Sequence, residues 1–311
     1  MTRRRPVIAV LTVGILLGLS GWTSGWFKPE ETVVTEVAPG VFFRKILTKP
    51  KFIGCNNGWI VFKDFVLVVD ANFPSQADEV IKEIRKTTDK PIRYVFDTHY
   101  HGDHADGNVV FRKVGATAIA NENSQSQFDT KGIKGFEDTQ KSNPTEFGHG
   151  TPGSLEYVKP FIYFPQKLVI DDGTQRVELL HLGHAHTAGD AMAWLPKQGI
   201  LFTGDTCVNG QFNAMADSNT ESWIAVLTEL DKLPVQKICP AHGEMADKSL
   251  LALQRRYIVE LRQYVQNAID KGLSLDAIKN EIVFPFYQEW TGVPVKENVE
   301  NISFVYKELR K

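Results

Sequence analysis

Three histidines and one aspartate lie within six residues of this chain. His99, His101, Asp103 and His104 belong to the run DTHYHGDH (residues 97–104), although the whole chain of 311 residues holds only 8 histidines. Imidazole nitrogens and carboxylate oxygens are the ligands that zinc and similar divalent ions prefer. This density of ligands predicts a metal site rather than a polar loop that is rich in histidine by chance.

The run lies where a strand is expected to give way to a helix. Residues 91–96 are apolar and read as a strand, and residues 105–114 are expected to begin a helix. Proteins of the α/β class place their chemistry in such strand-to-helix loops. Three further groups of candidate ligands follow predicted strands, so one edge of a sheet could gather all four; they lie at residues 181–190, 204–206 and 240–244.

This ordered set of clusters resembles the metallo-β-lactamase superfamily. The five motifs of that family are an Asp after the second core strand, His-x-His-x-Asp-His, a later His, a bridging Asp and a final His. In this chain they read Asp70, the run 99–104, His186, Asp205 and His242, in order over about residues 30 to 248. The resemblance implies an α/β fold, namely the family's four-layer αββα sandwich, followed by a helical extension at the C-terminal end.

The resemblance also implies a binuclear metal site. The implied ligands are His99, His101 and His186 for the first ion, and Asp103, His104 and His242 for the second. Asp205 would bridge the two ions, and Asp70 would orient the ligand loop by hydrogen bonds without ligating. Two zinc ions are expected, with iron or manganese as alternatives.

Other histidines compete with this assignment. His184 lies two residues before His186 and remains an alternative ligand, although His186-Thr187-Ala188-Gly189 matches the family pattern His-Thr-x-Gly. We expect His181 to pack at a strand end or to contact a ligand, and His149, in a glycine-rich loop, to be solvated.

Composition is that of a soluble globular protein, and the resemblance implies a small-molecule substrate. Apolar residues make up 42% of the chain and charged residues 23%, and the net charge is −2. Because this balance gives no broad basic surface, nucleic acid is not expected as a partner. Oligomeric state is not predicted.

The three cysteines do not make a disulfide framework. Cys207 and Cys239 lie near the metal motifs, so a pair between them stays open. Thiolate also suits zinc, but the family's bridging position falls on Asp205 and not on Cys207.

The N-terminal segment has the pattern of an export signal. Arginines at positions 3–5 precede the apolar run 7–19, and small residues follow at 20–25. Residues 6–27 carry no charge, which is long enough for an uncleaved membrane anchor. We therefore expect residues 1–27 to be a signal peptide or anchor and the enzyme to be exported, either periplasmic or secreted.

The remainder divides into a catalytic domain at residues 30–248 and a helical extension at residues 249–311. Ser75 and Asp78 have capping-box spacing at the start of a helix, and residues 35–46 read as a hairpin. Residues 121–160 show little periodicity and are expected to form a weakly structured lid. The extension either packs on the sandwich or lines the substrate pocket with Phe284, Phe286, Tyr287 and Trp290.

The implied activity is hydrolysis of an ester, thioester or lactone by a metal-bound hydroxide, with Asp103 as the catalytic residue that aims it. A catalytically dead binding protein is disfavoured because no ligand position is missing. The family's oxygen-reducing branch has Glu where this chain has His101, which disfavours that reaction. A mono-iron sulfur dioxygenase remains an alternative, because that branch shares the His-x-His pattern.

β-Lactam hydrolysis is the other alternative. The family's best-known lactamases carry Cys where this chain has Asp205 and, three residues later, a Lys that grips the antibiotic's carboxylate. Val208 occupies that later position here. Lys131 or Lys134 of the lid could supply the missing cation.

Overall fold

The computed structural model describes residues 32–46, 54–147, 154–210, 213–281, 290 and 299–311. The expected export segment, residues 1–27, lies outside the described residues, as do His149, Phe284, Phe286 and Tyr287. Within the described part, no helix is both long enough and apolar enough to cross a membrane.

Seven strands form the first sheet in the order in which they occur along the chain. The predicted hairpin at residues 35–46 is present as two antiparallel strands that meet at Gly40, whose positive φ of 72° suits the turn. The later strands pair in parallel from β4 onward. The strands are β1 (Val33–Ala38), β2 (Val41–Lys45), β3 (Asn57–Val61), β4 (Val66–Val69), β5 (Ile92–Phe96), β6 (Thr117–Asn121) and β7 (Ile162–Phe164).

A second, five-stranded sheet has the order β12-β11-β10-β9-β8. Its β11 and β12 run parallel, and its other neighbours are antiparallel. The strands are β8 (Lys167–Asp171), β9 (Arg176–Leu180), β10 (Met192–Leu195), β11 (Ile200–Phe202) and β12 (Lys237–Cys239).

The two sheets pack face to face around a common apolar core. Phe96 and Leu67 of the first sheet and Phe202 and Leu179 of the second belong to one cluster of buried side chains. The sheets approach closely at Gly58, where an added Cβ would lie 2.2 Å from a ring carbon of Phe202. Only glycine leaves room for that ring.

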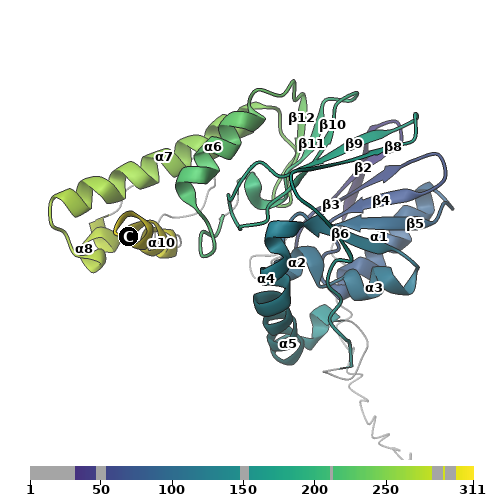
Figure 1. Ribbon diagram of the computed structural model, residues 1–311, viewed down its shortest axis with the longest axis horizontal. Helices are drawn as coiled ribbons and strands as arrows, with labels where there is room; N and C mark the ends of the chain where they lie inside the picture. Colours follow the sequence, from purple (N-terminus) through teal and green to yellow (C-terminus); the bar gives the residue numbers. More distant parts are fainter. Residues whose placement is uncertain (1–31, 47–53, 148–153, 211–212, 282–289, 291–298) are drawn as a thin grey trace, which may run out of the picture.

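Helices cover both outer faces, which confirms the predicted four-layer αββα sandwich (Figure 1). On the first sheet, α1 (Pro74–Thr87) and α3 (Asn108–Lys113) bury their apolar faces against β4 and β5. On the second sheet, α6 (Thr220–Leu230) and α7 (Ser249–Asp270) do the same against β10 and β11.

The start of α1 differs from the prediction. The helix begins at Pro74, its N-cap residue is Phe73, and no side chain caps it. The capping box expected from Ser75 and Asp78 is therefore wrong. Proline in the first turn has its φ already near the helical value and lacks the N–H that would need a partner, so Pro74 places both polar residues inside the helix.

The expected weakly structured lid is largely helical. A 3₁₀ turn (Glu122–Ser124), α4 (Gln125–Gln127) and a π-helical turn (Phe128–Gly132) lead into α5 (Ile133–Ser142), and a further 3₁₀ turn spans Pro144–Phe147. The order comes from tertiary packing that periodicity does not reveal, because Phe136 stacks edge-on against Phe147 and Tyr157. We call residues 122–147 the helical lid.

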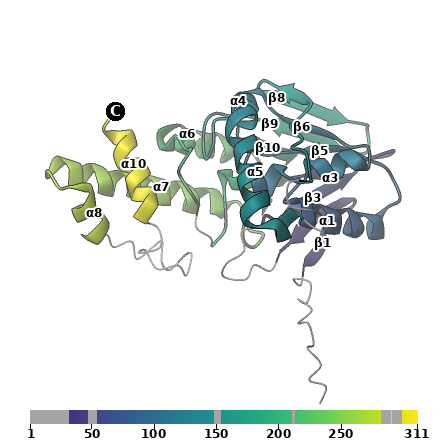
Figure 2. The same cartoon turned by 90° about the horizontal axis from the view of Figure 1, so that it is seen from below.

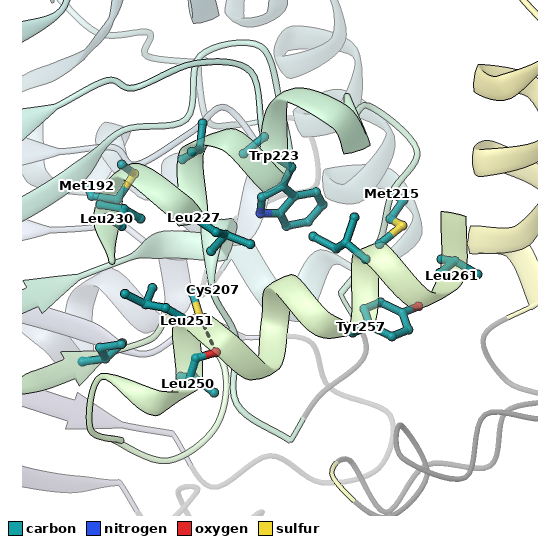
Figure 3. Close-up of a cluster of buried hydrophobic side chains, with 14 of the residues drawn as sticks. Met192, Cys207, Met215, Trp223, Leu227, Leu230, Leu250, Leu251, Tyr257 and Leu261 are labelled. Carbon is teal, nitrogen blue, oxygen red and sulfur yellow. Dashed lines mark hydrogen bonds between the residues drawn. The ribbon is translucent and has the colours of Figure 1, made fainter. Parts of the chain in front are cut away.

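The C-terminal region forms an arm of helices beside the sandwich. It consists of α7, α8 (Leu275–Glu281) and α10 (Val299–Leu309), and α8 and α10 lie near the far end of α7 (Figures 1 and 2). Apolar side chains of the arm merge with those of α6 and the second sheet into one cluster, part of which is drawn in Figure 3. The predicted helices at residues 250–270, 274–282 and 298–309 thus agree closely with the structure.

Candidate metal centre

The candidate ligands lie in loops at the carboxyl ends of neighbouring strands. Asp70 follows β4, the run 99–104 follows β5 and includes α2 (Gly102–Ala105), and His186 lies in the loop after β9. Asp205 belongs to a 3₁₀ turn (Gly204–Thr206) after β11, and His242 follows β12. Because β4 and β5 are parallel, as are β11 and β12, these loops meet at one end of the sandwich.

Gly204 allows the two sheets' loops to touch. Its φ is 51°, and an added Cβ would lie 2.4 Å from the Oγ1 atom of Thr98. A larger residue would push the turn that carries Asp205 away from the histidine run.

Three imidazole nitrogens converge on one point. The Nδ1 atom of His101 lies 2.9 Å from Nε2 of His99 and 3.0 Å from Nε2 of His186. Around a tetrahedral zinc ion with Zn–N bonds of 2.0–2.1 Å, ligand nitrogens lie about 3.3 Å apart. The spacing of these three nitrogens therefore suits one divalent ion.

Hydrogen bonds on the outer side of each ring define which nitrogen carries the proton. The Nδ1 atom of His186 lies 2.8 Å from the carbonyl oxygen of Ala214, and Nε2 of His101 lies 3.3 Å from a carboxylate oxygen of Asp217. A carbonyl or carboxylate oxygen only accepts, so in both rings the outer nitrogen holds the hydrogen. The inner nitrogen of each neutral ring then presents a lone pair.

The same argument applies to His99. Its Nδ1 lies 3.2 Å from Oγ1 of Thr98. Because the Thr98 hydroxyl already donates its hydrogen to Asp70 at 2.8 Å, its oxygen accepts from Nδ1 of His99, and the inner Nε2 of that ring presents a lone pair. Three lone pairs therefore face one another, an arrangement that a cation would stabilise. Burial lowers the pKa of His186 to about 4 and also lowers the pKa of His99 well below its usual range, so both rings stay neutral and ready to ligate.

Asp103, His104 and His242 form a second convergent group. The Nε2 atoms of His104 and His242 each lie 3.4 Å from Oδ2 of Asp103. Burial alone would lower the pKa of His242, but Asp205 and Asp103 raise it to about 10. Burial would likewise lower the pKa of His104, and Asp103, Asp70 and Asp205 together raise it. The carboxylates thus favour positive charge here, which a metal ion would supply in place of protons.

Asp205 faces both groups. Its Oδ1 lies 3.3 Å from Nε2 of His242 and 3.5 Å from Nε2 of His104, whereas its Oδ2 lies 3.6 Å from Nε2 of His186. Among the described residues, neither Oδ1 of Asp205 nor Nε2 of His104 makes a hydrogen bond, although both are buried. Buried polar atoms normally have partners, so these two orphaned atoms fit metal ligands.

Asp70 makes the hydrogen bonds predicted for it. Its Oδ1 accepts from the backbone N–H and the hydroxyl of Thr98, both at 2.8 Å, and its Oδ2 lies 3.1 Å from Nδ1 of His104. The latter contact turns Nε2 of His104 towards the second group. The φ of Asp70 is 64°, a strained value for a residue with a side chain, held by these contacts.

The side chains of His184 and His181 do not point into either group of candidate ligands. The Nε2 atom of His184 lies 2.6 Å from the carbonyl oxygen of Asp217, and His181 bonds to the carbonyl oxygen of Asp190 and to the side chain of Asn123. In the described part of the chain, neither joins a convergent ligand group.

All three cysteines are free and buried. The thiol of Cys207 points to the carbonyl oxygen of Leu250 in α7 (Figure 3), away from the convergent ligands. Cys55 was not among the sequence candidates, yet its sulfur lies within 4.8 Å of ligand atoms of Asp70 and His104. Nothing in its sequence neighbourhood marks it.

Asp217 is the main residue that the sequence analysis missed. Its carboxylate contacts His101, accepts from the hydroxyl of Tyr100 and pairs with Lys131 of the helical lid. His101, Lys131 and Tyr100 together hold the pKa of Asp217 below its usual range. Asp217 follows no strand and belongs to no motif, so only the three-dimensional structure identifies it.

A cavity of about 370 Å³ opens beside His101 and Asp103. Its lining includes the aromatic rings of Phe73, Tyr100 and Phe136, together with Lys131. Trp290, predicted to wall the pocket, instead packs near Tyr257 of α7, with ring centroids 6.5 Å apart. The aromatic wall therefore comes from the helical lid and the first sheet's loops and not from Trp290.

Comparison with known proteins places this geometry in a family. A model of the metallo-β-lactamase superfamily matches residues 51–242. The metallo-β-lactamase IND-1 of Chryseobacterium indologenes is 26% identical over 204 residues, which cover 62% of this chain and 74% of that protein. The β-lactamase-like protein 2 homologue of Caenorhabditis elegans is 23% identical over 261 residues, which cover 79% of this chain and 75% of that protein.

Two further similarities are to a longer protein and to a solved structure. A linear primary-alkylsulfatase from a Pseudomonas strain is 22% identical over 76% of this chain, which spans about half, 52%, of that longer protein. Among solved structures, a metallo-β-lactamase from Pontibacter korlensis superposes with a TM-score of 0.60 at 19% identity. The superposed part covers 74% of this chain and 99% of that protein. At that identity the superposition supports the fold alone.

Proposed function

This chain belongs to the metallo-β-lactamase superfamily, and on that premise we propose that it is a binuclear zinc hydrolase that cleaves an ester, thioester or lactone bond. The observation that carries the proposal is the carboxylate of Asp205, whose two oxygens face two separate groups of ligand atoms. A carboxylate placed in this way could contribute one oxygen to each of two neighbouring ions. His99, His101 and His186 would hold the first ion, and Asp103, His104 and His242 the second.

The chain's own residues support hydrolysis. When bound, divalent ions would supply a nucleophile near neutral pH, because a metal ion lowers the pKa of water, and they would polarise a substrate carbonyl. Asp103 lines the cavity and can accept a hydrogen bond from the attacking water, which would aim it. The rings of Tyr100 and Phe136 give the cavity an apolar wall against which an acyl group can pack.

β-Lactam hydrolysis is the second candidate, because several similar proteins are named metallo-β-lactamases. Val208, at the position of the lactamase lysine, is apolar and fully buried, so it cannot form an ion pair with a substrate carboxylate. Lys131 does line the cavity, but it is paired with Asp217, whereas Lys134 pairs with Asp138 on the same face of α5. A charge-assisted contact contributes roughly 1.5–3 kcal/mol, so losing it weakens binding about tenfold or more.

A screen of kcat/KM tests the substrate class. It compares esters, thioesters, lactones, sulfate esters and phosphodiesters with penicillins and carbapenems, and we expect the carbonyl esters to exceed the β-lactams. A carbapenem turned over near the diffusional range while esters remain untouched would overturn the proposal. Lys131→Gln, with Lys134→Gln as its matched control, then shows whether any β-lactam activity depends on the cavity lysine.

A further inference from the structure

Two ligands of the first ion depend on one short segment, residues 213–219. The carbonyl oxygen of Ala214 accepts from Nδ1 of His186 at 2.8 Å, and the carboxylate of Asp217 lies 3.3 Å from Nε2 of His101. The carbonyl oxygen of Asp217 also contacts His184. The direction of two inner nitrogens therefore follows the position of this segment.

Asn301 of α10 clamps the segment on both sides of Ala214. Its Nδ2 donates to the carbonyl oxygen of Asn213 at 2.8 Å, and its Oδ1 accepts from the N–H of Met215 at 3.1 Å. The Asn301 side chain is fully buried, and its Nδ2 also donates to the hydroxyl of Tyr257 in α7 at 3.1 Å. The N–H of Met215 and the carbonyl group of Ala214 belong to one planar peptide unit. The bond to that N–H, together with the bond to the carbonyl oxygen of the preceding peptide, therefore fixes the direction of the Ala214 carbonyl group.

Further contacts from α7 secure the same segment. Met215 is buried in the cluster that includes Tyr257 and Leu261, and it lies close to these residues in Figure 3. Asn213 donates to the carbonyl oxygen of Asp205 at 3.0 Å and lies 3.4 Å from Oε1 of Gln254. The C-terminal arm thus reaches the turn of the bridging carboxylate as well.

We propose that Asn301 is a positioning residue of the metal centre, which acts on His186 through Ala214. By fixing the segment, it keeps the outer nitrogen of His186 protonated and its inner lone pair directed at the ion. Removing a direct outer partner of a metal ligand typically costs 10–100-fold in affinity. Asn301 acts one step further out, so we expect a loss of about tenfold. The inference rests on the metal centre of the proposed function, but not on any substrate.

The test measures zinc affinity by chelator competition in the full chain, with Asn301→Leu beside Val305→Ala. Leu has the same branched arrangement of side-chain heavy atoms as Asn and removes all three hydrogen bonds, those to Asn213, Met215 and Tyr257. Val305 is a fully buried residue of the same helix, and its truncation removes packing but no hydrogen bond. We expect both variants to lower Tm, and only Asn301→Leu to weaken zinc binding, with a changed visible spectrum when cobalt replaces zinc.

A wild-type measurement covers the case in which Asn301→Leu does not fold. If the clamp and the ion are coupled, zinc must strengthen the clamp as the clamp strengthens zinc binding. Hydrogen exchange of the Met215 amide should then slow when zinc is added. Unchanged zinc affinity in a folded Asn301→Leu variant, or unchanged Met215 exchange in the wild type, would overturn the inference. Wild-type protein that binds no zinc at all would instead defeat the proposed function.

Discussion

At the scale of single residues, hydrogen-bond direction makes the strongest case for metal binding. Each of His99, His101 and His186 has its outer nitrogen tied to an oxygen, so the inner lone pairs meet at about 3 Å. The sequence predicted His99 and His101 from the density of candidate ligands in residues 97–104, and His186 from its match to the family pattern His-Thr-x-Gly. It did not predict Ala214 or Asp217, because a backbone carbonyl is invisible in sequence and an isolated loop aspartate has no distinguishing pattern.

Substitution of Asp205 by Ala should weaken both metal positions at once. Its two carboxylate oxygens face different ligand groups, so we expect the metal content of purified protein to fall from about two ions per chain to below one. Elemental analysis after dialysis gives the measurement. Glu244→Gln is the matched control, because that carboxylate is exposed and belongs to neither group. An Asp205→Ala protein that retained both ions and full activity would refute the ligand assignment.

At the scale of elements, the strands and the long helices followed from apolar periodicity, and the helical lid did not. Residues 122–147 owe their helical turns to rings such as Phe128 and Phe136 that become buried only when the chain folds. Similarly, Pro74 overrides the polar capping signal of Ser75 and Asp78. Local patterns therefore predict elements that carry their own amphipathic face, and miss those whose order comes from distant contacts.

Asp106, just after α2, gives the fold a dependence on pH. Burial, with a smaller contribution from Asp103, raises the pKa of Asp106 to about 8, against about 3.9 in an unfolded chain. The folded state binds the proton more tightly, so this contribution to stability is complete below about pH 4 and is lost as pH rises through about 8.

We therefore expect Asp106→Asn to exceed the wild type in Tm by a few degrees at pH 8, and the difference to vanish near pH 4. Thermal melts of the metal-free proteins provide the measurement, because bound ions would themselves shift the equilibrium. Asp64→Asn, at an exposed turn between β3 and β4, should show no such trend. A difference between Asp106→Asn and wild type that is constant with pH would contradict this account.

At the scale of the whole molecule, the four-layer sandwich could be predicted from the sequence. The contacts of the C-terminal arm with residues 213–219 could not. The helices of the arm were predicted from periodicity. Asn301 and Gln254 were not singled out, because they are buried polar residues whose hydrogen-bond partners lie far away in sequence. Through Gln254 of α7 and Asn301 of α10, the arm contacts the segment beside the metal centre.

Export is a further proposal at this scale. Arginines at positions 3–5 followed by the apolar run 7–19 should direct the protein out of the cytosol. A fusion of residues 1–30 to a reporter that is active only outside the cytosol should give signal, and replacing the three arginines by glutamate should reduce it. A stable but silent fusion of the native segment would speak against export.

The measurement that tests the central claim most directly is the metal content of the purified wild-type chain, taken together with ester hydrolysis during metal removal and return. We predict close to two zinc ions per chain, loss of hydrolysis when a chelator removes them, and recovery on adding zinc. One iron per chain would support the dioxygenase alternative, and hydrolysis that persists in the metal-free protein would contradict the account.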